Sequence, residues 1–488
     1  MNVPIVDPGQ TGTGADQRAA RRALILLACT QFLLLLDTSI INVAVPSIGD
    51  ELDIGAADLP WIANAYLVTF GGLLLLSGRA ADLVSRRGLF VTGLVVLVIG
   101  SAAGALAGDA GWLIAARAAQ GVGAALAASA AFALLLSLFP DGPARHRALG
   151  LFAAMAGVGG AAGTVLGGVL TSWLGWRSTF VLSVLAGAVL AAAAVRMPRV
   201  DRAPGRGARF GVTAALSSTA ALGSTAYALV NTGVHGWTAP STLAPAAAAV
   251  ALLIVFVIAE RRAETPLVPP TLLRRRAVIT ANLLACLAQF AYFPMFFLVS
   301  VYLQTVLGYS AVLGGLGLLP LSLTVVLVAA GTGRLIGRYG VRAVLIAGWL
   351  LTAAGLGWLA LLSVDGSFAA DVLPPSLLLG VALPLVTVTS SVAATAQARP
   401  AEIGLASGLI NTSQQFGAVL GLAVLSGVAT ARTLAVGGPA DPAALTNGFA
   451  VAFLVAAVLA VLAACYALTL RTGAPHGDES TPGPAPTS

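Results

Sequence analysis

The amino-acid sequence predicts an all-α polytopic membrane protein with fourteen transmembrane helices, arranged as two six-helix bundles and two inserted helices. Of its 488 residues, 58% are hydrophobic and only 9% are charged, and the mean hydropathy is +0.94. About a quarter of the residues of a soluble protein are charged. Apolar runs of about 20 residues recur along the chain, enough to cross a hydrocarbon core of ~30 Å as helix. The runs are continuous and do not alternate with polar residues, which favours helices over a β-barrel.

We expect the spans, in order, at 23–46, 60–78, 89–107, 112–138, 148–171, 178–196, 210–231, 241–259, 278–303, 311–332, 342–363, 372–396, 404–430 and 447–470. The polar segment 1–21 is predicted to be a cytoplasmic N-terminal tail. The segment 471–488, rich in Pro, Gly, Ser and Thr, is predicted to be a disordered cytoplasmic tail. A signal peptide is the alternative for the first span, but Asp37 and Asn42 in its middle favour a transmembrane helix.

The basic residues predict the orientation. All 26 are arginines, because the chain contains no lysine. With the N-terminus in the cytoplasm, 23 of them fall in the tails and the cytoplasmic loops, and only Arg177 and Arg432 fall in outer loops. Cytoplasmic loops of membrane proteins carry an excess of basic residues. Both termini are therefore predicted to be cytoplasmic.

Two halves of the chain repeat each other. Gly163-Thr-Val-Leu-Gly167 corresponds to Gly417-Ala-Val-Leu-Gly421 at an offset of 254, and Gly78-Arg79 returns as Gly333-Arg334 at an offset of 255. Like-oriented repeats place a substrate site between the halves, near the middle of the membrane. We expect an N-terminal six-helix bundle at 22–196, a basic linker with two extra transmembrane helices at 197–277, and a C-terminal six-helix bundle at 278–470.

Two charged side chains, Asp37 and Arg117, lie deep inside the predicted spans. A charge at mid-bilayer costs about 2.5–3.5 kcal/mol on insertion scales, so it is tolerated where it faces a cavity or a partner. One carboxylate and one guanidinium indicate proton coupling. The alternative is a buried ion pair that only joins the first and fourth helices, although such pairs are usually weak stabilisers.

Several motifs carry a family resemblance. They are Leu36-Asp37-Thr-Ser-Ile-Ile-Asn42-Val-Ala-Val-Pro46, Trp61 with Tyr66, Gly78-Arg79-Ala-Ala-Asp82-Leu-Val-Ser-Arg86-Arg87, Arg117-Ala-Ala-Gln120-Gly121 and Gly159-Gly-Ala-Ala-Gly163-Thr-Val-Leu-Gly167-Gly168. Together they resemble the signatures of the major facilitator superfamily, in its fourteen-helix branch of drug:proton antiporters. That branch contains multidrug and quaternary-ammonium efflux permeases.

The resemblance implies the major facilitator fold and a secondary active transporter, not an enzyme. It implies proton-coupled efflux of lipophilic drugs or antibiotics across the bacterial inner membrane by alternating access. In the family, the fourth-helix arginine is associated with proton transfer, so Asp37 and Arg117 are the expected proton-coupling pair. The expected partners are a lipophilic small molecule, protons and membrane lipids. The protein is expected to be a monomer that needs no cofactor, since the proton gradient drives transport.

The resemblance also assigns two structural motifs. The loop of Gly78, Arg79, Asp82, Arg86 and Arg87 is the expected gate, in which Asp82 latches the two halves and the arginines contact anionic lipid heads. The sequence departs from the family pattern here, with Leu83 and Ser85 in place of an Arg and a Gly. In the fifth span, Gly159, Gly163, Gly167 and Gly168 form the expected antiporter motif, with Thr164 in place of a proline. Plain tight helix packing is the alternative reading of these glycines.

Polar and aromatic residues at helical spacing predict a substrate cavity. Apolar walls with a few amides suit lipophilic compounds of varied shape. The alternative role of these polar residues is hydrogen bonding between helices. The predicted cavity residues are Gln31, Thr38, Asn42, Gln120, Asn282, Gln289, Tyr292, Phe293, Asn411, Gln414 and Gln415.

Other functional classes are disfavoured. A chain without lysine has no phosphate-binding loop of the ATPase kind. The arginines are scattered, so the net charge of +7 does not indicate nucleic-acid binding. The three cysteines lie in separate apolar runs without metal-ligand spacing, so no metal site is expected. A dedicated exporter or importer of one metabolite is the first alternative function. A non-transporting membrane receptor on the same fold is a second.

Overall fold

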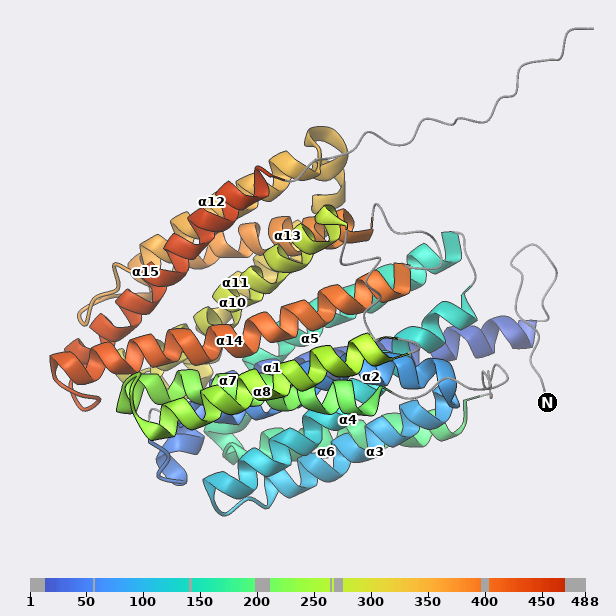
Figure 1. Ribbon diagram of the computed structural model, residues 1–488, viewed down its shortest axis with the longest axis horizontal. Helices are drawn as coiled ribbons and strands as arrows, with labels where there is room; N and C mark the ends of the chain where they lie inside the picture. Colours follow the sequence, from blue (N-terminus) through green and yellow to red (C-terminus); the bar gives the residue numbers. More distant parts are fainter. Residues whose placement is uncertain are drawn as a thin grey trace, which may run out of the picture.

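A computed structural model describes residues 14–55, 58–139, 143–197, 211–263, 266, 275–395 and 403–469. Within these residues the chain forms fourteen α-helices and two short π-helical turns, with no strand (Figure 1). The predicted all-α fold is thereby confirmed. The tails at 1–13 and 471–488 and most of the basic linker at 198–210 lie outside the described residues.

The helices of the first half and of the inserted pair follow the predicted spans. They are α1 (Gly14–Glu51), α2 (Pro60–Leu83), α3 (Arg86–Ala105), α4 (Ala110–Leu138), α5 (Pro143–Leu174), α6 (Arg177–Val195), α7 (Val212–His235) and α8 (Pro240–Arg262). Capping residues explain several starts: Asp109 accepts a hydrogen bond from the amide of Trp112, and Ser85 accepts one from Gly88. A side-chain oxygen at this position satisfies one of the amides that a helix start leaves free.

The second half follows the same plan. It consists of α10 (Arg276–Val301) with the π-helical turn η1 (Tyr302–Val306), α11 (Ala311–Tyr339), α12 (Val341–Leu359), η2 (Phe368–Val372), α13 (Leu373–Thr395), α14 (Ile403–Val436) and α15 (Pro442–Ala467). Equivalent helices pack against each other in the two halves: the pair α1 and α5 corresponds to α10 and α14, and the pair α3 and α4 corresponds to α12 and α13. The internal repeat in the sequence is therefore a structural repeat.

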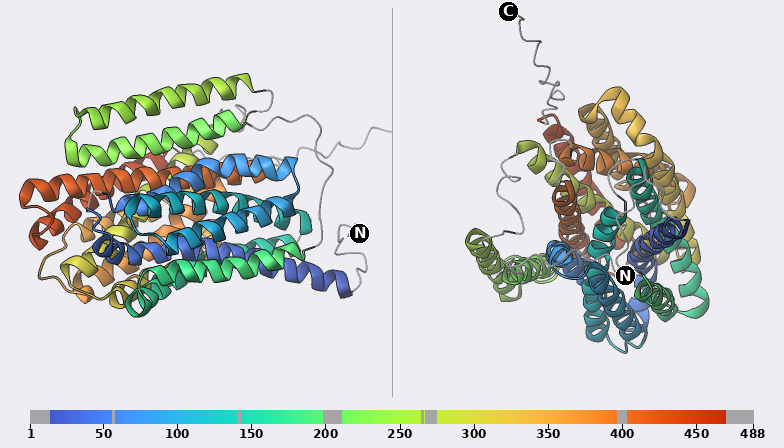
Figure 2. Two further views of the ribbon diagram at one scale, coloured as in Figure 1. Left: turned by 90° about the horizontal axis from the view of Figure 1, so that it is seen from below. Right: turned by 90° about the vertical axis from the view of Figure 1, so that its right-hand side faces the viewer.

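Thirteen of the described helices are long and apolar enough to cross a membrane. The remaining helix, α7, corresponds to the predicted span 210–231 and has 24 residues. Its Ser and Thr content makes it more polar, and hydroxyls such as those of Ser217 and Thr219 bond to carbonyls of their own helix. Because α7 packs against α2 and α14 as well as α8, part of its surface faces protein. Figure 2 shows α7 and α8 as a pair at one side of the molecule.

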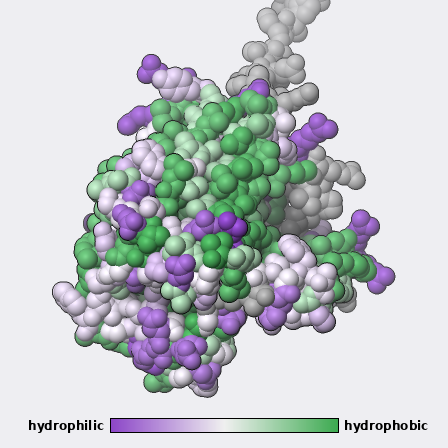
Figure 3. Space-filling view, turned by 90° about the vertical axis from the view of Figure 1, so that its left-hand side faces the viewer, coloured by the Kyte–Doolittle hydropathy of each residue, from purple (hydrophilic) through white to green (hydrophobic). Residues whose placement is uncertain are grey.

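Several contacts between the two bundles lie near one end of the molecule. We call the end where α1 begins the near end, and the end where α1 stops the far end. Figure 3 views the far end, where hydrophilic side chains are scattered among hydrophobic ones. Near this end Ser300 of α10 donates a hydrogen bond of 3.1 Å to the carbonyl of Asn42, and Gln304 donates one of 3.2 Å to that of Val43.

A second far-end contact joins α5 to α11. The amide of Val312 donates a hydrogen bond of 3.2 Å to Oγ of Ser172. Toward the near end of α11, by contrast, a Cβ at Gly331, Gly333 or Gly337 would meet no atom within 4 Å. We call the α5–α11 and α1–α10 contacts the far-end seam. The bundles are thus in contact at the far end.

Candidate functional site

The two intramembrane charges meet inside the N-terminal bundle. Nη1 of Arg117, on α4, lies 2.8 Å from Oδ2 of Asp37, on α1, and both side chains are almost fully buried. A charge of either sign in this environment needs a partner, because desolvation would otherwise cost several kcal/mol. The two side chains therefore contact each other across α1 and α4, as the sequence led us to expect.

Three further side chains complete the site. Ser183 of α6 donates a hydrogen bond of 2.8 Å to Oδ1 of Asp37, and Nε2 of Gln120 approaches the same oxygen at 3.3 Å. Gln120 accepts from Nη1 of Arg117 at 2.9 Å through Oε1 and donates to Oγ of Ser101, on α3, at 2.8 Å. Both carboxylate oxygens of Asp37 therefore have hydrogen-bond donors, and four helices meet at one polar cluster.

Arg117 has two additional contacts, both on α2. Its Nε donates a hydrogen bond of 3.0 Å to the carbonyl of Ile62, and its guanidinium carbon lies 4.5 Å from the ring centroid of Tyr66. A cation–π contact that is shielded from water contributes about 2 kcal/mol. Hereafter the Asp37 network denotes Asp37, Arg117, Gln120, Ser101 and Ser183.

The arrangement can couple a proton to the packing of the bundle. While Asp37 is charged, its carboxylate and the guanidinium neutralise each other. A proton on Asp37 removes the anion and leaves the buried cation with only neutral partners. Removing one partner of a buried pair costs about 3–5 kcal/mol of stability. The packing around Arg117 must therefore change when Asp37 is protonated.

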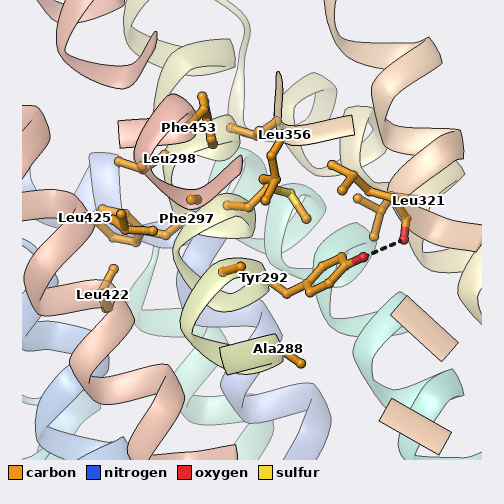
Figure 4. Close-up of a cluster of buried hydrophobic side chains, with 14 of the residues drawn as sticks. Ala288, Tyr292, Phe297, Leu298, Leu321, Leu356, Leu422, Leu425 and Phe453 are labelled. Atoms are coloured by element: carbon orange, nitrogen blue, oxygen red, sulfur yellow. Dashed lines mark hydrogen bonds between the residues drawn. The ribbon is translucent and has the colours of Figure 1, made fainter. Parts of the chain in front are cut away.

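The structure divides the predicted cavity residues into three groups. Gln120 belongs to the Asp37 network and is fully buried. Tyr292 is enclosed in the C-terminal bundle among apolar side chains (Figure 4), and its hydroxyl lies 2.8 Å from that of Thr352. The others lie on the helices where the two bundles face each other: Gln31, Thr38 and Asn42 on α1, Asn282, Gln289 and Phe293 on α10, and Asn411, Gln414 and Gln415 on α14. Of these nine, Asn411 is exposed, Asn42 and Asn282 are buried and the rest are half-buried.

Asp37 does not share the environment of the other polar residues of α1. Its partners lie on α4 and α6, within the N-terminal bundle. Asn42 instead lies where α1 meets α10, and its carbonyl accepts from Ser300. Because a helix has about 3.6 residues per turn, the side chains of Asp37 and Asn42 point in directions more than a quarter of a turn apart around the helix axis. The two residues therefore face different neighbours.

The predicted gating loop joins α2 to α3 at the near end. Nε of Arg86 donates a hydrogen bond of 3.2 Å to the carbonyl of Ala81, and Arg87 donates one to the carbonyl of Val195 at the end of α6. Gly78 and Arg79 lie in the last turns of α2. The side chain of Asp82 lies outside the described residues, so the latch remains a prediction.

The glycines of the predicted antiporter motif allow close helix packing. Added Cβ atoms at Gly159, Gly163 and Gly167 would collide with α1, where the nearest backbone atoms are the carbonyl oxygens of Phe32, Leu36 and Ile40. A Cβ at Gly168 would lie 2.5 Å from the carbonyl oxygen of Ala311, on α11. Only small residues permit backbones to approach this closely. Gly168 thus lies in the far-end seam, whereas the other three pack within the bundle.

The fold and the site define a multi-pass membrane protein made of two repeated helical bundles. A profile of the Major Facilitator Superfamily matches residues 27–422. The chain belongs to this superfamily.

Several relatives are named as antibiotic export or resistance proteins. The chain is 37% identical over 476 residues to the cephamycin export protein CmcT of Amycolatopsis lactamdurans, covering 96% of this chain and 97% of that protein. It is 34% identical to the puromycin resistance protein pur8 of Streptomyces alboniger, covering 90% and 88%. A solved bacterial homologue of the human lysosomal transporter Spinster has a TM-score of 0.67 at 16% identity, covering 93% and 97%, and shows the fold alone. Membership and relatives together indicate a transporter.

Proposed function

We propose that the protein exports lipophilic drugs or antibiotics across the bacterial inner membrane in exchange for protons, by alternating access. The observation that carries this proposal is the buried Asp37–Arg117 pair at 2.8 Å inside a hydrogen-bonded cluster. A scaffold without transport would gain little from so costly an arrangement. The proton gradient is the proposed energy source, with no bound cofactor.

In the proposed cycle, the ion pair of the present structure represents the state after Asp37 has released its proton, with the far-end seam closed. We place both termini and the near end in the cytoplasm, following the arginine distribution. Substrate enters from the cytoplasm while the far-end seam is closed. Asp37 releases its proton when substrate binds and takes up another after the far end has opened to the outer, acidic side. The half-buried Gln31, Gln289 and Gln414, on helices that face each other between the bundles, are proposed substrate contacts.

The proposed substrates are monocationic, zwitterionic or neutral lipophilic compounds, because the transmembrane helices, as far as the structure describes them, offer only one deep carboxylate. Exchange of one proton for one monocation moves no net charge, so the pH gradient alone supplies about 1.4 kcal/mol per unit. Export of a neutral compound would also draw on the membrane potential, about 2.3 kcal/mol per 100 mV.

A second candidate is dedicated export of one antibiotic. Identity of 37% over almost the full length of a cephamycin exporter favours it, since both bundles and the inserted helices align. This alternative differs from the first only in the range of compounds that the cavity accepts. The coupling to protons is the same in both.

Everted membrane vesicles test the proposal. A respiratory pH gradient is established, and cephamycin, puromycin and the lipophilic cation tetraphenylphosphonium are added in turn. We expect at least one compound to dissipate the gradient with the wild-type protein and not with Asp37→Asn. Asp441→Asn, which alters a carboxylate that caps α15 far from Arg117, is the matched control and should behave as wild type. Export of a compound without any proton movement would overturn the proposal.

A further inference from the structure

Tyr66 lies outside the Asp37 network but contacts its cation. The guanidinium carbon of Arg117 is 4.5 Å from the centroid of the Tyr66 ring, which in turn stacks on Phe70 at 5.7 Å between centroids. Tyr66 is only 1% exposed. The face of an aromatic ring attracts a guanidinium at this distance, and more strongly away from water. The ring therefore helps to fix the position of the guanidinium.

Helix α2 holds Arg117 at two points one turn apart. Nε of Arg117 donates to the carbonyl of Ile62, and the ring of Tyr66 follows four residues later. Residues four apart lie on the same face of a helix. The partner of Asp37 is thus attached to α2 as well as to its own helix.

The opposite side of α2 contacts the rest of the molecule. A Cβ at Gly71 would lie 2.5 Å from the Cβ of Gln415, on α14. A Cβ at Gly72 would collide with Thr219, on α7. Close-packed helices have no free space to absorb a displacement. If α2 shifts, α14 and α7 must therefore move with it, or these contacts must break.

The groups around Asp37 limit what a change of pH can do there. Within the described residues, the titratable or charged groups facing Asp37 are Arg117 of α4 and Tyr66 of α2. Helices α3 and α6 contribute hydroxyls, those of Ser101 and Ser183. Helix α5 carries no titratable residue between 148 and 172. Among the described residues, Asp37 is therefore the one acidic group of the Asp37 network.

We propose that Tyr66 is a positioning residue whose ring keeps Arg117 attached to α2. Gain or loss of a proton at Asp37 then moves α2 against α14. Because these two helices belong to different bundles, the movement changes how the bundles meet and with it the closure of the far-end seam. The inference rests on the proposed proton coupling and adds the element that transmits it. When Asp37 takes up a proton from water, Arg117 loses its anionic partner but keeps the carbonyl of Ile62 and the ring of Tyr66. Because both contacts lie on α2, the helix follows the guanidinium.

Spin labels across the far-end seam test this inference without requiring a substrate. Cys29, Cys286 and Cys465 are replaced by Ala, and labels are attached through Trp173→Cys and Leu313→Cys, at exposed positions of α5 and α11. Distances are measured in proteoliposomes at about pH 5 and about pH 8, a range over which few side chains titrate. In the wild type we expect the fraction with an open far end to differ at least about threefold between the two conditions.

The variants separate the ring from the hydroxyl. Tyr66→Phe keeps the aromatic face and should keep the pH response, whereas Tyr66→Leu and Asp37→Asn should reduce it to less than about 1.5-fold. Phe90→Leu is the matched control, because it removes a buried aromatic side chain of the same bundle from a separate cluster, and it should respond as wild type. If Tyr66→Leu does not fold, Tyr66→Met gives the same answer, because its flexible side chain adapts to the space that the ring leaves.

Two results would overturn the inference. The first is a pH response that Asp37→Asn abolishes but Tyr66→Leu keeps. In that case the role of Tyr66 fails, while the proposed proton coupling stands. The second is a wild-type protein whose distances do not depend on pH. In that case the vesicle experiment decides independently whether proton exchange itself fails.

Discussion

Ser183 donates a hydrogen bond of 2.8 Å to Oδ1 of Asp37, the carboxylate oxygen that Arg117 does not contact. This bond joins α6 to the charged pair and makes the environment of Asp37 more than an isolated ion pair. A hydrogen bond to a charged group contributes about 1.5–3 kcal/mol. The hydroxyl therefore has a measurable share in holding the carboxylate in position.

The first prediction concerns that hydroxyl. Ser183→Ala should slow substrate-driven proton release about tenfold, because it removes one of the donors that stabilise the charged carboxylate. Substrate affinity should change little, since Ser183 is enclosed in the N-terminal bundle. Ser217→Ala is the control, a buried serine of α7 that bonds to its own helix. Equal effects of the two substitutions would contradict the prediction.

The second prediction concerns the shape of the cation. Arg117→Lys should abolish proton-coupled transport, although the charge is kept. The guanidinium uses Nε and Nη1 for three acceptors on α1, α2 and α4, and an ammonium cannot reproduce that fork. Arg177→Lys, at a partly exposed far-end ion pair with Glu51, should transport normally. Transport by Arg117→Lys at the wild-type rate would show that charge alone suffices.

The third prediction concerns the far-end seam. Gly168→Ala should weaken closure between α5 and α11, because the added methyl group would lie 2.5 Å from the carbonyl oxygen of Ala311. Overpacking of this kind costs about 1–3 kcal/mol. Labelling of Ser172→Cys by a membrane-impermeant thiol reagent should therefore become faster. Gly160→Ala, whose methyl group would have an ordinary contact of 3.6 Å with Ser39, should leave the labelling rate unchanged.

The fourth prediction separates cavity residues from packing residues. Asn411→Ala should weaken substrate binding severalfold with little loss of stability, since Asn411 is exposed on α14. Tyr292→Phe should show the reverse, a loss of about 1 kcal/mol of stability and normal binding, because its hydroxyl bonds inside the C-terminal bundle. Binding titrations and thermal unfolding of the purified protein distinguish the two. A binding defect in Tyr292→Phe would place its side chain on the substrate path.

The sequence was sufficient for the spans, the repeat and the central charged pair, because each depends on a strong physical constraint. Apolar length determines the spans, and the cost of an isolated intramembrane charge explains why Asp37 and Arg117 meet. The glycines at 163 and 167, together with 417 and 421, pack against α1 and α10 respectively, as expected if a repeat in sequence is a repeat in structure.

The sequence was not sufficient for the residues that surround the pair. Ser101 and Ser183 are small hydroxyl side chains in apolar spans, and nothing in their spacing marks them as partners of Gln120 and Asp37. Tyr292 matched a polar stripe but lies within a bundle. Which face of a helix meets which neighbour is decided by packing between helices, and that information is not contained in the pattern of any one span.

The most direct test of the central claim is proton release from the purified protein in weakly buffered detergent solution, followed with a pH-indicator dye. A compound that the wild-type protein exports is added, and the released protons are counted per protein molecule. The account predicts about one proton released by the wild type and none by Asp37→Asn, with binding retained in both. Equal release from both proteins, or release from neither despite binding, would contradict a coupling role for Asp37.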